Sequence, residues 1–111
     1  MKKKVILIGG DSFGKGDEKL GSILTSNFLR ILGEHEELPE AIFFLNYGVK
    51  LVCEGSEKLD HLKKLEQRGV LLLACKTCLD YLNLADKAAV GKIAGMPDLI
   101  ELMTNFEIVS L

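Results

Sequence analysis

Two cysteines three residues apart, Cys75 and Cys78, are the side chains best suited to chemistry in this chain. They lie in the stretch LLLACKTCLDYLNLADK, directly after a run of three leucines. A C-x-x-C pair is compatible with a metal clip, a dithiol redox switch, a sulfur-handling site or two buried core residues. A structural zinc needs four ligands, and the only other soft side chains are Cys53, His35 and His61, at no finger spacing. We therefore expect no metal and no other cofactor at the pair.

The position of the pair favours a reactive role over a structural one. Cys75 ends a predicted strand, and Cys78 opens a predicted helix. A helix N-terminus stabilises the thiolate, which is the reactive form, and Lys76 is the nearest cation. We expect one of the two thiols to be a nucleophile with a depressed pKa and favour Cys75, because a strand end gives access. Cys53 ends an apolar stretch without a partner and is expected to be structural.

A glycine-rich segment, GGDSFGKGDE, begins at Gly9 and nearly spells a phosphate-binding loop. Gly14 and Lys15 stand at the required spacing, but Gly16 occupies the place of the hydroxyl residue that holds magnesium. Nucleotide binding is therefore not expected. A glycine-rich turn ahead of a helix still offers backbone N–H groups to an anion such as a thiolate or a persulfide.

The elements that position these residues are predicted from five apolar runs separated by amphipathic helices. Strands covered by helices on both faces are apolar throughout, and alternation of strands with helices is typical of a parallel sheet. We predict an α/β fold of three layers in a single domain, residues 1–111, with a mainly parallel sheet of about five strands. The predicted strands are Val5–Ile8, Ala41–Leu45, Val70–Ala74, Val90–Ala94 and Phe106–Val109.

Local signals place the helices between these strands. Large apolar residues from Leu20 to Leu32 recur at helical spacing after Asp17, and Gly33 stands where a C-terminal cap belongs. The other predicted segments are a turn or strap at Val49–Cys53, a helix between Ser56 and Gly69, a short helix at Cys78–Asn83, and a helix from Pro97 to about Thr104.

The predicted topology brings distant loops together. In open parallel sheets, ligands bind beyond the carboxyl ends of the strands. Three segments should meet there: Gly9–Gly16, Asn46–Gly48 and Cys75–Cys78. The candidate site-lining residues from the first two segments are Gly10, Asp11, Asn46 and Tyr47.

Composition limits the partners and the setting of the chain. The 111 residues hold 14 basic and 16 acidic side chains, so no basic excess points to nucleic acid, and no apolar run is long enough to cross a membrane. Three cysteines form no disulfide framework, which favours a reducing, cytoplasmic setting. A hydrophobic content of 48% on a small chain favours a homo-oligomer, a dimer or a trimer.

Several sequence blocks together resemble the DsrE/DsrF-like superfamily. The blocks are GDSFGKGDEKLG, FFLNYGVKL, EGS before a helix, CLDYLNL after ACKT, and VGKIAGM, and in order they span essentially the whole chain. The closest resemblance is to the C-terminal domain of YedF-type sulfurtransferase-like proteins linked to selenium metabolism.

This resemblance implies a flavodoxin-like fold and a cysteine that carries sulfur as a persulfide. Counting back from Asn83 places Cys75 at the position of the reactive cysteine of superfamily sulfur carriers. The chain is thus expected to be a sulfur or selenium transfer protein, hence a candidate sulfurtransferase, whose donor or acceptor is a protein such as a TusA-like domain. The alternative is a non-catalytic binding or regulatory module that uses its cysteines structurally.

Overall fold

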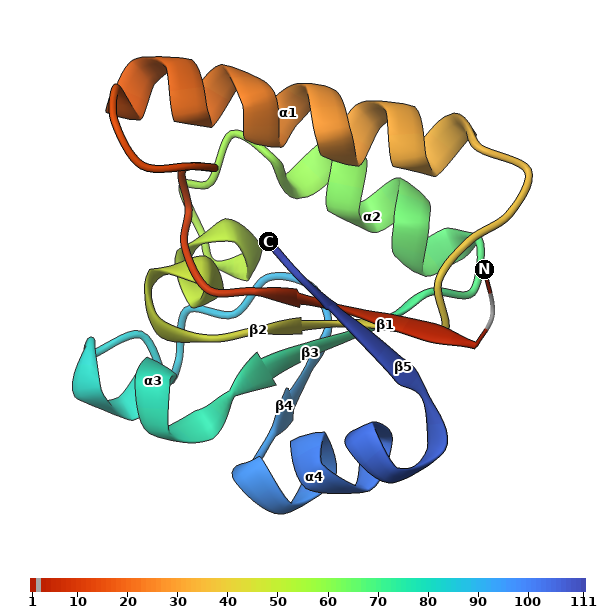
Figure 1. Ribbon diagram of the computed structural model, residues 1–111. Coiled ribbons are helices and arrows are strands. Elements are labelled where there is room, and N and C mark those ends of the chain that lie inside the picture. The colour runs from red at the N-terminus through yellow and green to blue at the C-terminus, as the bar shows by residue number, and fades with distance from the viewer. Residues whose placement is uncertain (2) are drawn as a thin grey trace.

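The fold is a five-stranded sheet between two layers of helices (Figure 1). The computed structural model describes Met1 and residues 3–111. Every pair of neighbouring strands runs parallel, in the order β4-β3-β2-β1-β5. The strands are β1 (Lys4–Ile8), β2 (Ala41–Phe44), β3 (Leu71–Cys75), β4 (Lys92–Ala94) and β5 (Glu107–Ser110). The predicted three-layer, flavodoxin-like α/β fold is confirmed.

Helices cover both faces of this sheet. Helices α1 and α2 lie on one face, and α3 and α4 lie on the other (Figure 1). Their bounds are α1 (Glu18–Glu34), α2 (Leu59–Gln67), α3 (Lys76–Tyr81) and α4 (Met96–Asn105), and a 3-10 helix, η1 (Asn46–Val52), follows β2. Within the described part of the chain, no helix combines the length and the apolar character needed to cross a membrane.

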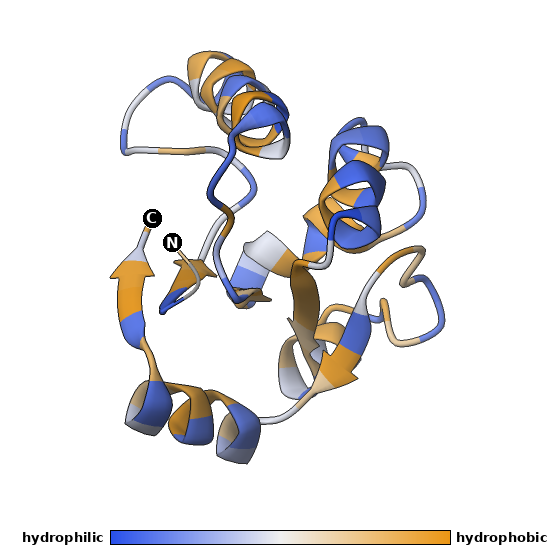
Figure 2. Ribbon diagram, turned by 90° about the vertical axis from the view of Figure 1, so that its right-hand side faces the viewer, coloured by the Kyte–Doolittle hydropathy of each residue, from blue (hydrophilic) through white to orange (hydrophobic). Residues whose placement is uncertain are grey.

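The core is built from strands that are apolar on both sides. All four residues of β2 are buried, because β2 lies at the centre of the sheet between the two helical layers. Figure 2 shows the strands mostly in the hydrophobic colour, whereas α1, α2 and α4 carry hydrophobic and hydrophilic bands side by side. The apolar runs therefore predicted the strands correctly, and burial is greatest in the inner strands β2 and β3, whereas β4 and β5 at the sheet edges are partly exposed.

Helix α1 begins as predicted but buries an unexpected face. The Asp17 carboxylate accepts the backbone N–H of Leu20 at 2.8 Å and caps the helix. The large apolar side chains Leu20, Ile23, Leu24 and Ile31 nevertheless remain exposed. The buried positions of the helix are Gly21, Thr25, Leu29, Leu32 and Gly33.

Close packing explains this choice of face. A Cβ at Gly21 would collide with Ser12 and Phe13 of the loop after β1, so only glycine fits at this position of the buried face. Gly33, predicted to end α1, lies inside the helix instead and packs against Lys64 and Leu65 of α2. The expected cap at Gly33 is therefore wrong, because the helix continues to Glu34 and His35 is its C-cap residue.

The other predicted helices are present, with bounds that differ by a few residues from the prediction. Pro97 stands in the first turn of α4, and the segment after β2 forms the predicted helical turn as a 3-10 helix. The Ser56 hydroxyl accepts the backbone N–H of Lys58 at 3.1 Å just before α2. The helix predicted to open at Cys78 begins earlier, at Lys76, so Cys75 is its N-cap residue and Cys78 belongs to its first turn.

Candidate functional site

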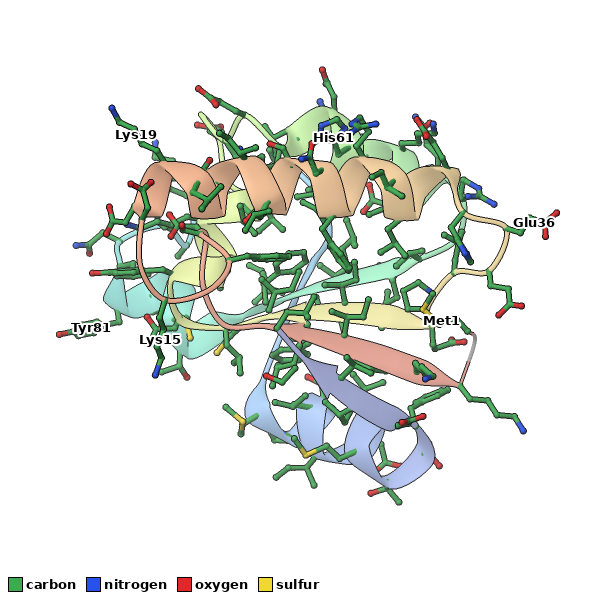
Figure 3. All side chains as sticks on the ribbon, turned by 45° about the horizontal axis from the view of Figure 1, so that its top comes forward. Met1, Lys15, Lys19, Glu36, His61 and Tyr81 are labelled. Carbon is green, nitrogen blue, oxygen red and sulfur yellow. The ribbon has the colours of Figure 1, made fainter. Side chains whose placement is uncertain are left out.

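The loops after β1, β2 and β3 meet at one edge of the sheet, as the topology predicted. The backbone N–H of Asn46, just past β2, points at the Cys78 sulfur with a nitrogen–sulfur distance of 3.1 Å. Residues 32 positions apart are thus joined at the candidate site. Figure 3 labels Lys15 and Tyr81 at this end of the molecule, with Met1 and Glu36 at the opposite end.

The start of η1 is held in place by a backbone contact that only glycine permits. A Cβ at Gly48 would lie 2.3 Å from the carbonyl oxygen of Ile8, the last residue of β1. The same carbonyl accepts the backbone N–H of Leu45 at 2.9 Å. Asn46 adopts a left-handed conformation with a φ of 51°, and its side-chain oxygen accepts the Tyr47 N–H at 2.9 Å. These contacts orient the N–H that faces Cys78.

The two thiols differ in their access to solvent. Cys75 is only 2% exposed, whereas Cys78 is partly buried. The expectation that the strand end would expose Cys75 is therefore wrong, because α3 starts immediately after it and the side chain of Cys75 belongs to the core. Of the pair, Cys78 is the thiol that a reagent can reach.

The pKa of the Cys78 thiol is raised, not depressed as the helix position suggested. Burial is the main cause, and the neighbouring Cys75 raises the pKa of Cys78 further, while the Asn46 N–H acts in the opposite direction. Helix α3 has only six residues, so its terminus offers little compensation. Lys76 does not help, because its ammonium pairs with Asp80 at 2.8 Å on the solvent side.

The third cysteine lies in the interior, as expected. The Cys53 thiol is 2% exposed and donates to the carbonyl oxygen of Val49 at 3.2 Å. Burial, followed by the nearby Glu54 carboxylate, raises the pKa of Cys53. Among the described residues, no group of three or more His, Cys, Asp or Glu side chains is arranged to hold a metal ion.

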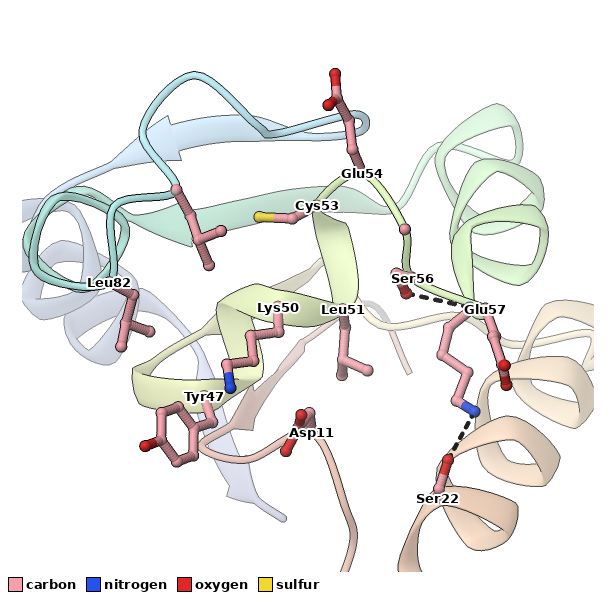
Figure 4. Close-up of a pocket in the computed structure, with 13 residues that line it drawn as sticks. Asp11, Ser22, Tyr47, Lys50, Leu51, Cys53, Glu54, Ser56, Glu57 and Leu82 are labelled. Atoms are coloured by element: carbon pink, nitrogen blue, oxygen red, sulfur yellow. Dashed lines mark hydrogen bonds between the residues drawn. The ribbon is translucent and has the colours of Figure 1, made fainter. Parts of the chain in front are cut away.

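A pocket of about 610 Å³ is lined by residues of η1, of the loop between η1 and α2, and of the segment after α3 (Figure 4). Asp11 and Tyr47, two of the predicted site-lining residues, line it, whereas neither Cys75 nor Cys78 does. Gly10 lies on the loop after β1 and does not line the pocket.

Two residues that line this pocket, Lys58 and Ser22, were not predicted from the sequence. Lys58 and Ser22 meet there, with the Lys58 ammonium donating to the Ser22 hydroxyl at 2.9 Å (Figure 4). The two residues are 36 positions apart on different helical segments, so only the packing of α1 against the start of α2 brings them together. A lysine at a helix start, a position that the helix dipole disfavours, was the one available hint.

The protein is an α/β protein with a parallel sheet and a thiol pair at the carboxyl edge of its strands. The chain is a member of the DsrE/DsrF-like family, whose model matches residues 2–109, and this family is associated in general with sulfur relay. A search of curated protein sequences finds no significant match.

Two solved structures share the fold over the full length of both chains. One is the YchN protein from E. coli, with a TM-score of 0.73, and the other is MTH1491 from Methanobacterium thermoautotrophicum, a protein of unknown function, with a TM-score of 0.74. Each is 19% identical to this chain, and each covers 100% of it and is covered to 100% by it. At this identity the likeness extends to the fold alone.

Proposed function

We propose that the protein transfers sulfur, or selenium, by carrying it as a persulfide on Cys78. The observation that carries this proposal is the partly accessible Cys78 sulfur, which faces the Asn46 N–H at the carboxyl edge of the sheet. A backbone N–H at this distance stabilises a thiolate and, equally, the anion of a bound persulfide. The family's general association with sulfur relay supports the same chemistry.

The proposed reaction has two steps. The Cys78 thiolate attacks the outer sulfur of a donor persulfide, so a Cys78–S–SH group forms and the donor leaves as a thiolate. The buried Cys75 thiolate then attacks the Cys78 Sγ, which forms a Cys75–Cys78 disulfide and expels the outer sulfur as hydrosulfide. In this second step the Cys75 sulfur is oxidised and the outer sulfur is reduced to hydrosulfide, while the Cys78 sulfur, oxidised in the first step, keeps its oxidation state. An acceptor thiol that attacks the outer sulfur first leaves Cys78 as a thiolate and takes the sulfur intact.

Intact mass after incubation with a persulfide donor tests this assignment. We expect Cys75→Ser to retain one added sulfur atom, because the resolving thiol is gone, and Cys78→Ser to gain none. Cys53→Ser is the matched control, since its thiol is equally buried but lies apart from the pair, and it should behave as the wild type. The mass increment must disappear with reductant. If Cys78→Ser keeps an increment, or if no donor ever gives one to Cys75→Ser, the proposal fails.

The second candidate is a binding or regulatory module whose cysteines are structural. The burial of Cys75 and the raised pKa of Cys78 favour this reading, because both make a thiol less reactive. The same mass experiment separates the two candidates, since a structural pair acquires no sulfur and reacts with iodoacetamide only after unfolding.

The proposal extends to the protein that exchanges sulfur or selenium with this chain. We propose that the chain is the functional counterpart of the C-terminal domain of YedF-type proteins and exchanges sulfur or selenium with a TusA-like domain. Adding such a domain in its persulfide form should load Cys78 without any small-molecule donor, and the absence of that loading would remove the TusA-like partner from the proposal.

We also propose that copies of this chain associate with one another through the exposed face of α1. This face carries Leu20, Ile23, Leu24 and Ile31, all at least 45% exposed. Apolar side chains grouped in this way are typical of protein interfaces. Sedimentation of the wild type should show a dimer or trimer, and Ile23→Lys should sediment as a monomer. A wild-type monomer at high concentration would contradict the proposal.

A further inference from the structure

The pocket lined by Asp11 and Tyr47 holds a buried ammonium group that pairs with no carboxylate of the described residues. Lys58 is only 6% exposed, yet among the described residues its ammonium makes one side-chain hydrogen bond, to the neutral Ser22 hydroxyl, and no salt bridge. An ammonium has three N–H donors, and a buried charge is costly unless it is paired. The remaining donors of Lys58 are thus available to an anion from outside the chain.

The geometry around Lys58 suits an anionic group. The Lys58 ammonium reaches the Ser22 hydroxyl at 2.9 Å, and Figure 4 shows Ser22 and Asp11 among the side chains that line the pocket. Lys58 also stands at the start of α2, where the unpaired N–H groups of the first turn add positive potential. A volume of about 610 Å³ falls within the range of small-molecule sites.

The charges of the pocket restrict which anion fits. Three carboxylates, on Asp11, Glu54 and Glu57, line the pocket together with the two ammonium groups of Lys50 and Lys58. A dianion such as phosphate would face repulsion from this acidic majority. A molecule that carries both charges, one at each end, avoids that repulsion because it satisfies the buried cation and a carboxylate at once.

We propose that this pocket binds a small zwitterion of the amino-acid type, with its carboxylate on Lys58 and Ser22 and its ammonium towards Asp11. The site is separate from the thiol pair, since neither thiol of the pair lines it. Tyr47 lines it and follows Asn46, whose N–H faces Cys78, so a bound ligand lies next to the sulfur site without contacting the sulfur.

The experiment is a titration of the isotopically labelled protein, followed by amide chemical shifts, with each of the twenty standard amino acids at millimolar concentration. Acetate and inorganic phosphate are the comparison ligands. We expect at least one amino acid to shift the amides of residues 50–58 and to bind more tightly than acetate. Binding of phosphate alone, or of no member of the panel, would overturn the proposal.

Three variants assign the contacts. Lys58→Met should weaken binding by about tenfold or more, because it removes a charge-assisted hydrogen bond. Lys63→Met is the matched control, since Lys63 is exposed on the same helix outside the pocket. Should Lys58→Met fail to fold, Ser22→Ala and Asp11→Asn carry the test and should each weaken binding. Unchanged affinity in the folded variants would overturn the proposal.

A cysteine variant keeps this test independent of the sulfur proposal. Cys78→Ser should bind the amino acid as the wild type does, even though it can no longer carry sulfur. Loss of sulfur loading with retained amino-acid binding therefore counts against neither proposal, whereas loss of binding in Cys78→Ser would overturn the separation of the two sites.

Discussion

Replacing Gly48 by alanine should destabilise the protein and disturb the site at the same time. The added Cβ would lie 2.3 Å from the Ile8 carbonyl oxygen, whereas ordinary contacts begin at 3.4 Å. Since the neighbour is backbone, η1 and the end of β1 must separate by about 1 Å, and the hydrogen bond from Leu45 to the same carbonyl is weakened. Overpacking of about 1–3 kcal/mol and a weakened hydrogen bond of about 1 kcal/mol give a total of about 2–4 kcal/mol.

The measurement is urea unfolding, with thermal unfolding as a second probe. The midpoint temperature should fall by about 8 °C or more for a domain of this size. Gly9→Ala is the matched control at the same edge, because a Cβ at Gly9 meets nothing within 4 Å, and its effect should stay within about 0.5 kcal/mol. The alkylation rate of Cys78 should change in Gly48→Ala, since Asn46 moves with η1. If Gly48→Ala unfolds at the same urea concentration as the wild type, the close contact between position 48 and the Ile8 carbonyl does not constrain the packing of η1 against β1.

Three further predictions concern single side chains. Cys75→Ala should lower the pKa of the Cys78 thiol, because Cys75 raises it, and the pH dependence of alkylation should show the decrease; an unchanged or higher pKa would contradict the assigned cause. Because burial raises the pKa of Cys53, the contribution of the neutral thiol to the free energy of unfolding is complete below about pH 8.5 and is lost as the pH rises through the raised pKa. In urea unfolding, the free energy of unfolding of Cys53→Ala should therefore decrease less at alkaline pH than that of the wild type. Arg68 donates to two backbone carbonyls at the end of α1, at 2.8 and 2.7 Å, so Arg68→Ala should lower the free energy of unfolding by about 1–3 kcal/mol, while Arg30→Ala, at an exposed site, should change it by less than about 0.5 kcal/mol.

The strands were predictable from the sequence because they are short, largely apolar runs, some of which end at residues that interrupt a strand. Gly9 and Gly10 follow β1, and Asn46 takes a left-handed conformation after β2. A run that is buried on both faces needs no alternation, so the pattern indicated both the strands and their parallel arrangement. The order of elements then fixed which loops meet at the carboxyl edge.

The face of α1 was not predictable from the same kind of pattern. Helical spacing identifies a stripe of large apolar residues, but it does not say whether that stripe packs inward. Here the loop after β1 packs closely against Gly21, and the face with Gly21 and Thr25 is buried while Leu24 is exposed. Tertiary packing, rather than local preference, decides the orientation of this helix.

The reactivity of the thiols also depends on information that the sequence lacks. Position after a strand and before a helix correctly placed the pair at the sheet edge, but it could not give the exposed fraction of either sulfur. The desolvation of Cys78 outweighs the Asn46 N–H, and that balance depends on how η1 and α3 pack. Likewise, the residues around Lys58 in the sequence do not predict that its ammonium donates to the hydroxyl of Ser22.

Because β5 pairs with β1, the sheet can be completed only late in the synthesis of the chain. Strand β1 pairs with β2 on one side and with β5 on the other, in a register that joins Lys4 to Glu107. During synthesis, β1 emerges before the other four strands, yet its second edge stays open until residue 110 has left the ribosome. An open strand edge on an incomplete chain is a site for unwanted pairing with other chains. Slow translation of the α4 and β5 segment should therefore prolong the period in which the nascent chain depends on chaperones.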